Sequence, residues 1–225
     1  MEQNVQQNGF QVEHCRSNCP KSACNWQNLY ETMVNKLNDL NLLQVLSQKI
    51  NPIHYHHFPK ISIAGCPNGC SQPDIKDFGI SGYVVPQITQ RQCAECNACV
   101  DACLEKALQR NSQEIIIDWS SCISCGDCLR VCPTGTLSAG EQGWTIRYGG
   151  RVGRHPRFSK LAGRVKNDDE AVSWISEALQ QYITQGQQQE RLTHFLEFVD
   201  LTLKKNENVQ SGHVSNGLIS EDQKP

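Results

Sequence analysis

The chain has 225 residues, enough for one domain or two small ones, and 13 of them are cysteines. Its formal net charge is −2 and its isoelectric point is about 6.4, so no strongly basic field indicates a nucleic-acid partner. No apolar run approaches the roughly 18 to 20 residues of a membrane span, and the first residues lack the charged and apolar regions of a signal peptide. We therefore expect a soluble, cytoplasmic protein.

The first half of the chain begins with a polar segment and continues with regular patterns. Residues 1–14, like residues 204–225, are rich in Gln, Asn and Ser, which predicts disordered tails. From Trp26 to Ile50, apolar residues recur every three or four positions, which predicts one amphipathic helix. Residues 60–64 alternate between polar and apolar and stop at a glycine, which predicts a strand.

Later segments predict further strands and two closing helices. The strands are short apolar or alternating runs, found at residues 79–85, 114–117 and 143–148. Asp168 is a suitable N-cap for a helix with a periodic apolar face, and a second such face predicts a helix over residues 190–203. Mixed in this order, the elements favour an α+β fold.

Eight cysteines form two copies of one spacing, C-x2-C-x2-C-x3-C. Three thiolates on a tight loop can hold three irons of one cubane, while the fourth points away and binds the other cluster. The spacing therefore predicts two [4Fe–4S] clusters in a ferredoxin module over residues 87–136. The first cluster would be held by Cys93, Cys96, Cys99 and Cys132, and the second by Cys122, Cys125, Cys128 and Cys103.

Zinc is the alternative metal, because two C-x2-C pairs can build a structural zinc site. Two complete four-cysteine runs separated by a β-prone segment are more specific to iron–sulfur clusters. The segment also resembles bacterial two-cluster ferredoxins, including Pro133 after the second run. Leu104 stands where the first run would normally have proline as well, and all eight cysteines are present.

Five further cysteines lie outside these runs, at positions 15, 19, 24, 66 and 70. Cys66 and Cys70 follow a predicted strand, which places two thiols at the mouth of a turn. Cys24 opens the predicted long helix, whose N-terminus favours a thiolate. Four of the five could hold a third cluster, with one spare; the alternative is that all five are free thiols in the core.

Three stretches resemble the cluster-binding half of siroheme sulfite and nitrite reductases: Ile61–Cys70 (ISIAGCPNGC), Asp77–Gly82 (DFGISG) and Gly149–Arg157 (GGRVGRHPR). In several members of that family a ferredoxin module is inserted at this place. The resemblance implies an α+β, nitrite/sulfite reductase-like iron–sulfur domain over residues 15–86 and 137–203. It also implies that this chain lacks the N-terminal half of the family enzymes.

The resemblance implies site residues as well. Cys24, Cys66 and Cys70 would bind the third cluster, with Cys19 as the fourth ligand and Cys15 in reserve. Cys70 would also bridge to the iron of a siroheme. The basic stretch would hold siroheme carboxylates or an anionic substrate through its guanidinium groups; the alternative is a solvated loop that offsets acidic neighbours. Its candidate residues are Arg151, Arg154 and Arg157.

By this resemblance the protein is an oxidoreductase. Electrons would pass from the two ferredoxin clusters to the third cluster and on to siroheme, for reduction of a small oxyanion such as sulfite or nitrite. The partner would be an electron-donor protein or a reductase subunit. The alternative function is a non-catalytic electron carrier without siroheme. His54, His56 and His57 are a further metal candidate, although a polar turn before a strand is favoured.

Overall fold

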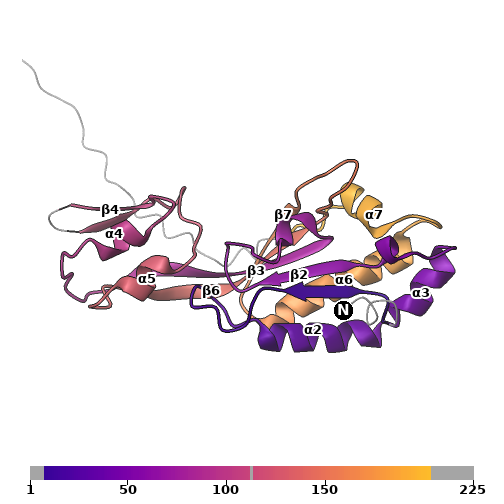
Figure 1. The fold of residues 1–225 in the computed structure, drawn as a ribbon, viewed down its shortest axis with the longest axis horizontal. Helices are drawn as coiled ribbons and strands as arrows, with labels where there is room; N and C mark the ends of the chain where they lie inside the picture. Colours follow the sequence, from indigo (N-terminus) through magenta and orange to yellow (C-terminus); the bar gives the residue numbers. More distant parts are fainter. Residues whose placement is uncertain (1–7, 112–113, 204–225) are drawn as a thin grey trace, which may run out of the picture.

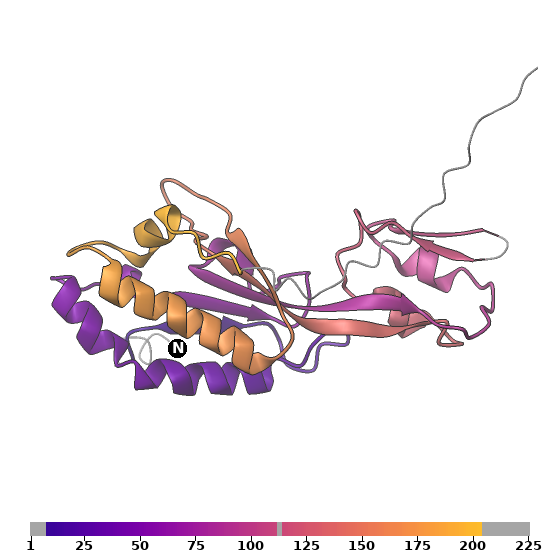
Figure 2. The same ribbon diagram turned by 180° about the vertical axis from the view of Figure 1, so that it is seen from behind.

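The computed structural model describes residues 8–111 and 114–203 (Figure 1). The expected tail at 204–225 and the first seven residues of the expected N-terminal tail lie outside the described residues. The described chain forms a main lobe of sheet and helices and a smaller lobe at one end, joined by two long strands (Figures 1 and 2). We call the smaller part, residues 89–136, the cysteine lobe. No helix in the described ranges is both long and apolar enough to cross a bilayer.

A five-stranded sheet forms the centre of the main lobe. Its order across the sheet is β1 (Gln11–His14), β2 (Lys60–Ala64), β3 (Phe78–Ile88), β6 (Leu137–Tyr148) and β7 (Lys160–Val165). The first three strands are parallel, whereas β6 runs antiparallel to β3 and β7 antiparallel to β6. The chain leaves for the cysteine lobe on β3 and returns on β6, so this paired ribbon connects the lobes (Figure 2).

The sheet corrects several expectations from the sequence. Residues 11–14 form β1 and are not part of a disordered tail, and Phe10 before them is buried. Strands β3 and β6 extend beyond the predicted 79–85 and 143–148 because they pair with each other far out toward the cysteine lobe. The first half of β6 is rich in polar residues and glycine, so apolar alternation did not predict it as a strand.

The long predicted helix is two helices, α2 (Gln27–Asp39) and α3 (Leu42–Lys49). Asn41 between them has a left-handed backbone with φ of 47°, a conformation that asparagine tolerates better than most residues and that ends a helix. The N-cap of helix α6 (Asp168–Gln185) is Asn167 and not the predicted Asp168. The side chain of Asn167 accepts a hydrogen bond from the Glu170 backbone N–H. The last helix, α7 (Leu192–Phe198), is shorter than predicted.

The core of the main lobe lies between the sheet and helices α2 and α6, which cover the same face (Figures 1 and 2). Strand residues alternate between faces, so Ile61 and Ile63 of β2 enter the core while Ser62 faces the other side. Each fully buried side chain of this kind stabilises the fold by roughly 1.5–3 kcal/mol. Fully buried members include Leu29, Met33, Leu37, Ile80 and Leu179.

The cysteine lobe has a separate, smaller core. It contains the short helices α4 (Ala98–Ala102) and α5 (Asp127–Val131) and a two-stranded sheet of β4 (Leu108–Arg110) and β5 (Ile115–Ile117). Its buried apolar side chains, Leu108, Ile115, Ile117 and Leu137, pack with cysteines of both runs. Such a small apolar core leaves room for metal coordination to contribute to folding.

Candidate metal centres

The two cysteine runs repeat in the backbone as well as in the sequence. Positive φ angles occur at matching positions in each run and in the turn after it: Glu95, Asn97 and Lys106 in the first, Ser124, Gly126 and Gly135 in the second. Asn97 and Gly126 then begin the equivalent helices α4 and α5. Each run is therefore a tight loop followed by a single helical turn that turns its last cysteine away.

The structure brings Cys132 to the thiols of the first run. Burial raises the pKa of the Cys99 thiol, and negative charge on Cys93 and Cys132 raises it further. Cys132 therefore lies close enough to interact with the first run, although it follows α5 of the second.

The second run is completed by Cys103 in the same way. Burial raises the pKa of Cys128 to about 12, and the charges of Cys125, Cys122 and Cys103 add to this effect. All four thiols line one cavity together with Pro86 of β3. The cavity is only about 20 Å³. The argument that this site binds a cubane therefore depends on its four thiols and not on its volume. Four close thiols that repel one another as thiolates need a positive centre to hold them deprotonated.

Four of the five remaining cysteines also meet around one cavity, of about 250 Å³. Its thiols are Cys15, Cys19, Cys66 and Cys70. Cys15 directly follows β1, and Cys66 lies just beyond β2. Because β1 and β2 are neighbouring parallel strands, the residues that follow them emerge at the same end of the sheet. This volume is far more than a single water or ion requires.

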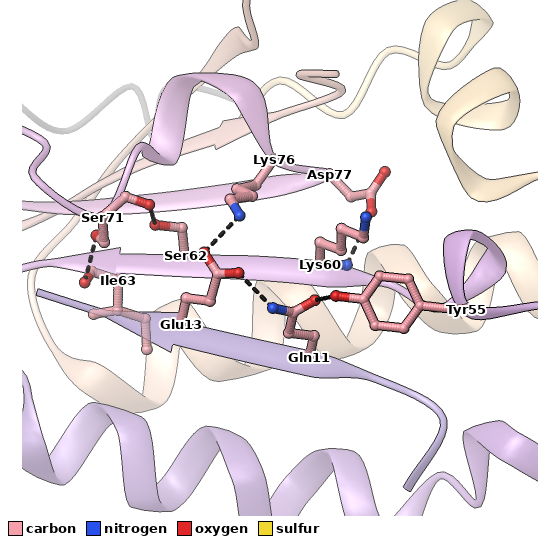
Figure 3. Close-up of polar contacts among 9 residues, drawn as sticks. All are labelled: Gln11, Glu13, Tyr55, Lys60, Ser62, Ile63, Ser71, Lys76 and Asp77. Carbon is pink, nitrogen blue, oxygen red and sulfur yellow. Dashed lines mark hydrogen bonds and ion pairs between the residues drawn. The ribbon is translucent and has the colours of Figure 1, made fainter. Parts of the chain in front are cut away.

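Hydrogen bonds fix both segments of this cavity on β2. The backbone N–H of Cys15 donates to the oxygen of Ile63 at 3.0 Å, and the N–H of Gly65 donates to the Cys15 sulfur at 3.3 Å. Figure 3 shows two hydrogen bonds between β2 and Ser71, the residue after the turn: Ser62 Oγ donates to the Ser71 oxygen at 2.6 Å, and Ser71 Oγ donates to the Ile63 oxygen at 2.9 Å. The turn that carries Cys66 and Cys70 is therefore held at both ends.

Electrostatic interactions identify the same four residues. Burial raises the pKa of the Cys66 thiol, and negative charge on Cys19, Cys70 and Cys15 raises it further. Cys70 is the exposed member of the set, and its sulfur accepts a hydrogen bond from the Asn68 side chain at 2.9 Å. The donor set therefore fits a third cubane, with one sulfur at the surface.

Cys24, one of the ligands expected from the sequence, does not line this cavity. Its sulfur is 3.3 Å from the oxygen of Gly143 and 3.6 Å from that of Tyr83, and burial raises its pKa. The thiol thus packs against β3 and β6, whereas Cys15, the expected reserve for Cys19, lines the cavity. Cys15 follows β1, a strand that the assignment of residues 1–14 to a tail did not predict.

No three His, Cys, Asp or Glu side chains in the described ranges are arranged to hold a single metal ion. A cubane distributes its thiolates over separate irons, so its ligands stand wider apart than the four around one zinc. His54, His56 and His57 form a 3-10 turn before β2. His57 Nδ1 accepts from the His54 backbone N–H, and burial lowers the pKa of His57 to about 4.

The basic stretch forms the loop between β6 and β7, and much of it is paired. Arg151 and Arg157 pair with each other as an isolated β-bridge. Their guanidinium groups both reach the carboxylate of Glu197 in α7, at 3.1 and 3.0 Å. Arg147 pairs with Asp74 at 3.2 Å. Two of the three predicted siroheme-binding arginines are therefore held in place by one carboxylate.

A cavity of about 560 Å³ lies beside this loop. Its charged lining is mostly basic and includes Lys60, Lys76, Arg151, Arg154 and Arg191, with Asp77 and Glu197 as the acidic members. The Asp77 side chain is buried, and Figure 3 shows its Oδ2 accepting from the Lys60 backbone N–H at 2.9 Å. Burial raises the pKa of Asp77 to about 7, against the opposing effect of Lys60 and Lys76. Such a lining suits a ligand with several negative charges.

Residues 12–203 match the family model of the nitrite and sulphite reductase 4Fe-4S domain. The chain is 30% identical over 157 residues to the coenzyme F420-dependent sulfite reductase of Methanocaldococcus jannaschii, covering 65% of this chain and 25% of that protein. It is 29% identical over 157 residues to the beta subunit of the dissimilatory-type sulfite reductase of Archaeoglobus fulgidus, covering 63% of this chain and 42% of the subunit.

Among solved structures, dissimilatory sulfite reductase I superposes with a TM-score of 0.58 at 17% sequence identity, over 95% of this chain and 57% of that one. This likeness supports the fold, an α+β architecture of the nitrite/sulfite reductase type. The chain spans a quarter to about two fifths of the length of the two sulfite reductases it matches in sequence. The matched residues include the sheet, the basic loop and the four cavity-lining thiols Cys15, Cys19, Cys66 and Cys70, which we call the third cysteine set. Because the match covers most of the chain, the chain belongs to the nitrite and sulphite reductase 4Fe-4S domain family.

Proposed function

We propose that the protein is an iron–sulfur electron-transfer unit of a sulfite- or nitrite-reducing system, with three [4Fe–4S] clusters. Two clusters would occupy the cysteine lobe as a ferredoxin module inserted between the halves of the main lobe. The third would be bound by Cys15, Cys19, Cys66 and Cys70. The observation that carries this proposal is the cavity lined by these four thiols at the end of β1 and β2.

Siroheme is the proposed acceptor of electrons from the third cluster. Cys70 is exposed at the edge of its set and could also contact the iron of a macrocycle. The basic cavity begins two residues further along the chain, at Gln72, and Arg154 and Arg151 would bind carboxylates there. Bound siroheme would supply the bond chemistry for reducing sulfite or nitrite, while these residues would bind and orient it.

A second candidate function is an electron carrier without siroheme that serves a larger reductase. The observation that favours it is that two of the three candidate siroheme-binding arginines, Arg151 and Arg157, already pair with the carboxylate of Glu197. In this case the basic loop would bind an acidic surface of the partner.

The visible spectrum of anaerobically purified protein, with iron counted, distinguishes these functions. Three cubanes correspond to about twelve irons per chain. About thirteen irons, twelve in the cubanes and one in siroheme, with siroheme bands would support the reductase. About twelve irons with only broad cluster absorbance would support the carrier. Fewer than about ten irons would contradict the three-cluster proposal. Cys70→Ser should remove about four irons and the siroheme bands together, while the ferredoxin clusters remain.

A further inference from the structure

The cysteine lobe touches the main lobe through the second cysteine run. Lys21, in the loop between Cys19 and Cys24, forms an ion pair with Asp127 of the second run at 2.8 Å. Asp127 also pairs with Arg130 of α5. Lys21 lies two residues from a proposed ligand of the third cluster, and Asp127 one residue from Cys128. A single ion pair thus joins the binding loops of two different clusters.

Backbone contacts place the same run against the sheet. The N–H of Val84 in β3 donates to the oxygen of Ser124 at 2.8 Å. A Cβ on Gly126 would lie 2.5 Å from a methyl carbon of Val84, so only glycine allows the loop to approach so closely. Arg164 of β7 reaches Ser124 Oγ at 3.4 Å and stacks on the Tyr83 ring at 4.3 Å. Tyr83 in turn offers its backbone oxygen to Cys24, in the loop of the third set.

The first run has a different environment. Its polar side chains bond within the cysteine lobe, where Arg110 contacts Asn97 at 2.8 Å and Glu95 at 3.5 Å. Helix α4 of this run packs on α5 and β4, whereas α5 packs on β6. The position that corresponds to Asp127 in the repeat is Ala98, so cluster binding as such does not require a carboxylate there.

From these contacts we propose that the cluster of Cys122, Cys125, Cys128 and Cys103 is the direct partner of the third cluster, and that Lys21 and Asp127 are the residues that position the two. The cluster of Cys93, Cys96, Cys99 and Cys132 is then the outer one, where electrons enter. This inference rests on the proposed function and adds the order of its clusters.

The step between the two inner clusters transfers one electron and moves no atom. The reduced cluster of the second run, [4Fe–4S]⁺, returns to the 2+ state, and the third cluster passes from 2+ to 1+. A low-potential one-electron donor must supply the electron, and dithionite serves as that donor in the experiments below. Tunnelling falls steeply with distance, so a contact that holds the two binding loops together sets the rate.

The first test compares paramagnetic coupling in the fully reduced holoprotein. Two reduced clusters that lie close together split and broaden each other's EPR signals. Cys96→Ala removes the outer cluster and should leave the splitting of the third cluster's signal intact, whereas Cys125→Ala removes the inner one and should abolish it. The opposite pattern, or splitting that survives both substitutions, would overturn the order. Each variant should lose about four irons, one cubane.

A second test leaves every cysteine in place, in case either variant loses the whole cysteine lobe. Lys21→Gln and Asp127→Asn should each slow reduction of the third cluster by about two- to fivefold in freeze-quench EPR, the range that a partly exposed ion pair permits. The double variant should be no slower than Asp127→Asn alone, because that substitution already removes the pair with Lys21. Lys21→Arg should restore the original rate.

The matched control is Glu95→Gln, which removes a carboxylate from the equivalent loop of the first run together with its pair to Arg110. It should leave the rate unchanged. An equal effect of Glu95→Gln and Asp127→Asn would show that loop charge alone matters and would overturn the positioning role. A native protein with only eight irons would instead contradict the proposed function itself, so the two failures are distinguishable.

Discussion

The sulfur of Cys24 lies 3.3 Å from the backbone oxygen of Gly143, a residue 119 positions further along the chain. This contact fastens the loop before α2 to β6, and it directs the thiol away from the cavity lined by Cys15, Cys19, Cys66 and Cys70. Cys24 therefore has packing partners outside this cavity, and the proposed ligand set of four thiols does not include it.

The role of Cys24 is tested by its substitution with alanine. Cys24→Ala should keep about twelve irons per chain and lower the free energy of unfolding by about 1 kcal/mol, because a partly buried hydrogen bond is lost. Cys66→Ala is the matched comparison and should lose about four irons. Iron analysis of the purified proteins measures both. A loss of about four irons from Cys24→Ala would restore it to the ligand set.

Gly82 of β3 packs closely against Gly65, which lines the cavity of the third cysteine set. A Cβ there would lie 2.4 Å from the Gly65 oxygen and 3.0 Å from Cys24 Cβ. The same Gly65 oxygen accepts hydrogen bonds from the N–H groups of Ala23 and Cys24, so it cannot move freely. Gly82→Ala should therefore reduce stability by about 1–3 kcal/mol, as overpacking does, and lower iron by up to one cubane.

Thermal unfolding and iron analysis of Gly82→Ala measure these effects. Ser81→Ala, at the neighbouring position of the same strand, removes atoms instead of adding them and should keep all the iron. Equal iron in both variants, with unchanged stability, would show that the sheet can shift at Gly82 without cost.

The buried carboxyl of Asp77 makes stability depend on pH. Burial raises its pKa from 3.8 to about 7, so the folded state holds a proton that the unfolded chain has already released. The free energy of unfolding should therefore fall as the pH rises from about 4 to about 7 and stay level above that. The difference between the two pKa values of Asp77 corresponds to a loss on the order of 4 kcal/mol in the free energy of unfolding.

Asp77→Asn cannot release a proton in this range and should flatten this part of the pH profile. Denaturant unfolding at a series of pH values from 5 to 8 compares the two proteins under identical conditions. The two curves should converge at the acid end and separate toward neutral pH. Parallel curves would show that Asp77 is ionised in the folded protein throughout this range.

Glu197 joins two guanidinium groups of the basic loop to α7. All three side chains are at least two-thirds buried, and Glu197→Gln would leave two positive charges facing each other without a carboxylate. We expect a loss of about 1 kcal/mol in unfolding free energy, at the upper end for pairs near a surface. Asp74→Asn, which removes the more exposed pair with Arg147, should cost less than about 0.5 kcal/mol. Equal losses of unfolding free energy in Glu197→Gln and Asp74→Asn would show that a carboxylate shared by two arginines stabilises the protein no more than a single exposed pair.

The local residue patterns of this chain were enough to predict its candidate metal ligands. Eight cysteines in two identical runs predict iron–sulfur ligands through their spacing, because the thiols on one tight loop are close together in the chain. The strand over residues 60–64 and the turn from Cys66 to Cys70 are also local features, and a strand and a turn occur there in the structure. The family assignment drew on the same short motifs and is confirmed by the match over residues 12–203.

Contacts between residues far apart in the chain could not be predicted in this way. Cys15 joins Cys66 because β1 pairs in parallel with β2, and a four-residue strand in a polar segment carries too little periodicity to be recognised. The break at Asn41 depends on a single left-handed residue, since the apolar spacing continues across it. The ion pair of Lys21 with Asp127 joins residues 106 positions apart. It depends on the pairing of β3 with β6, which places the cysteine lobe beside the loop that contains Lys21. Contacts of this kind follow from strand pairing between remote segments, which local residue patterns do not encode.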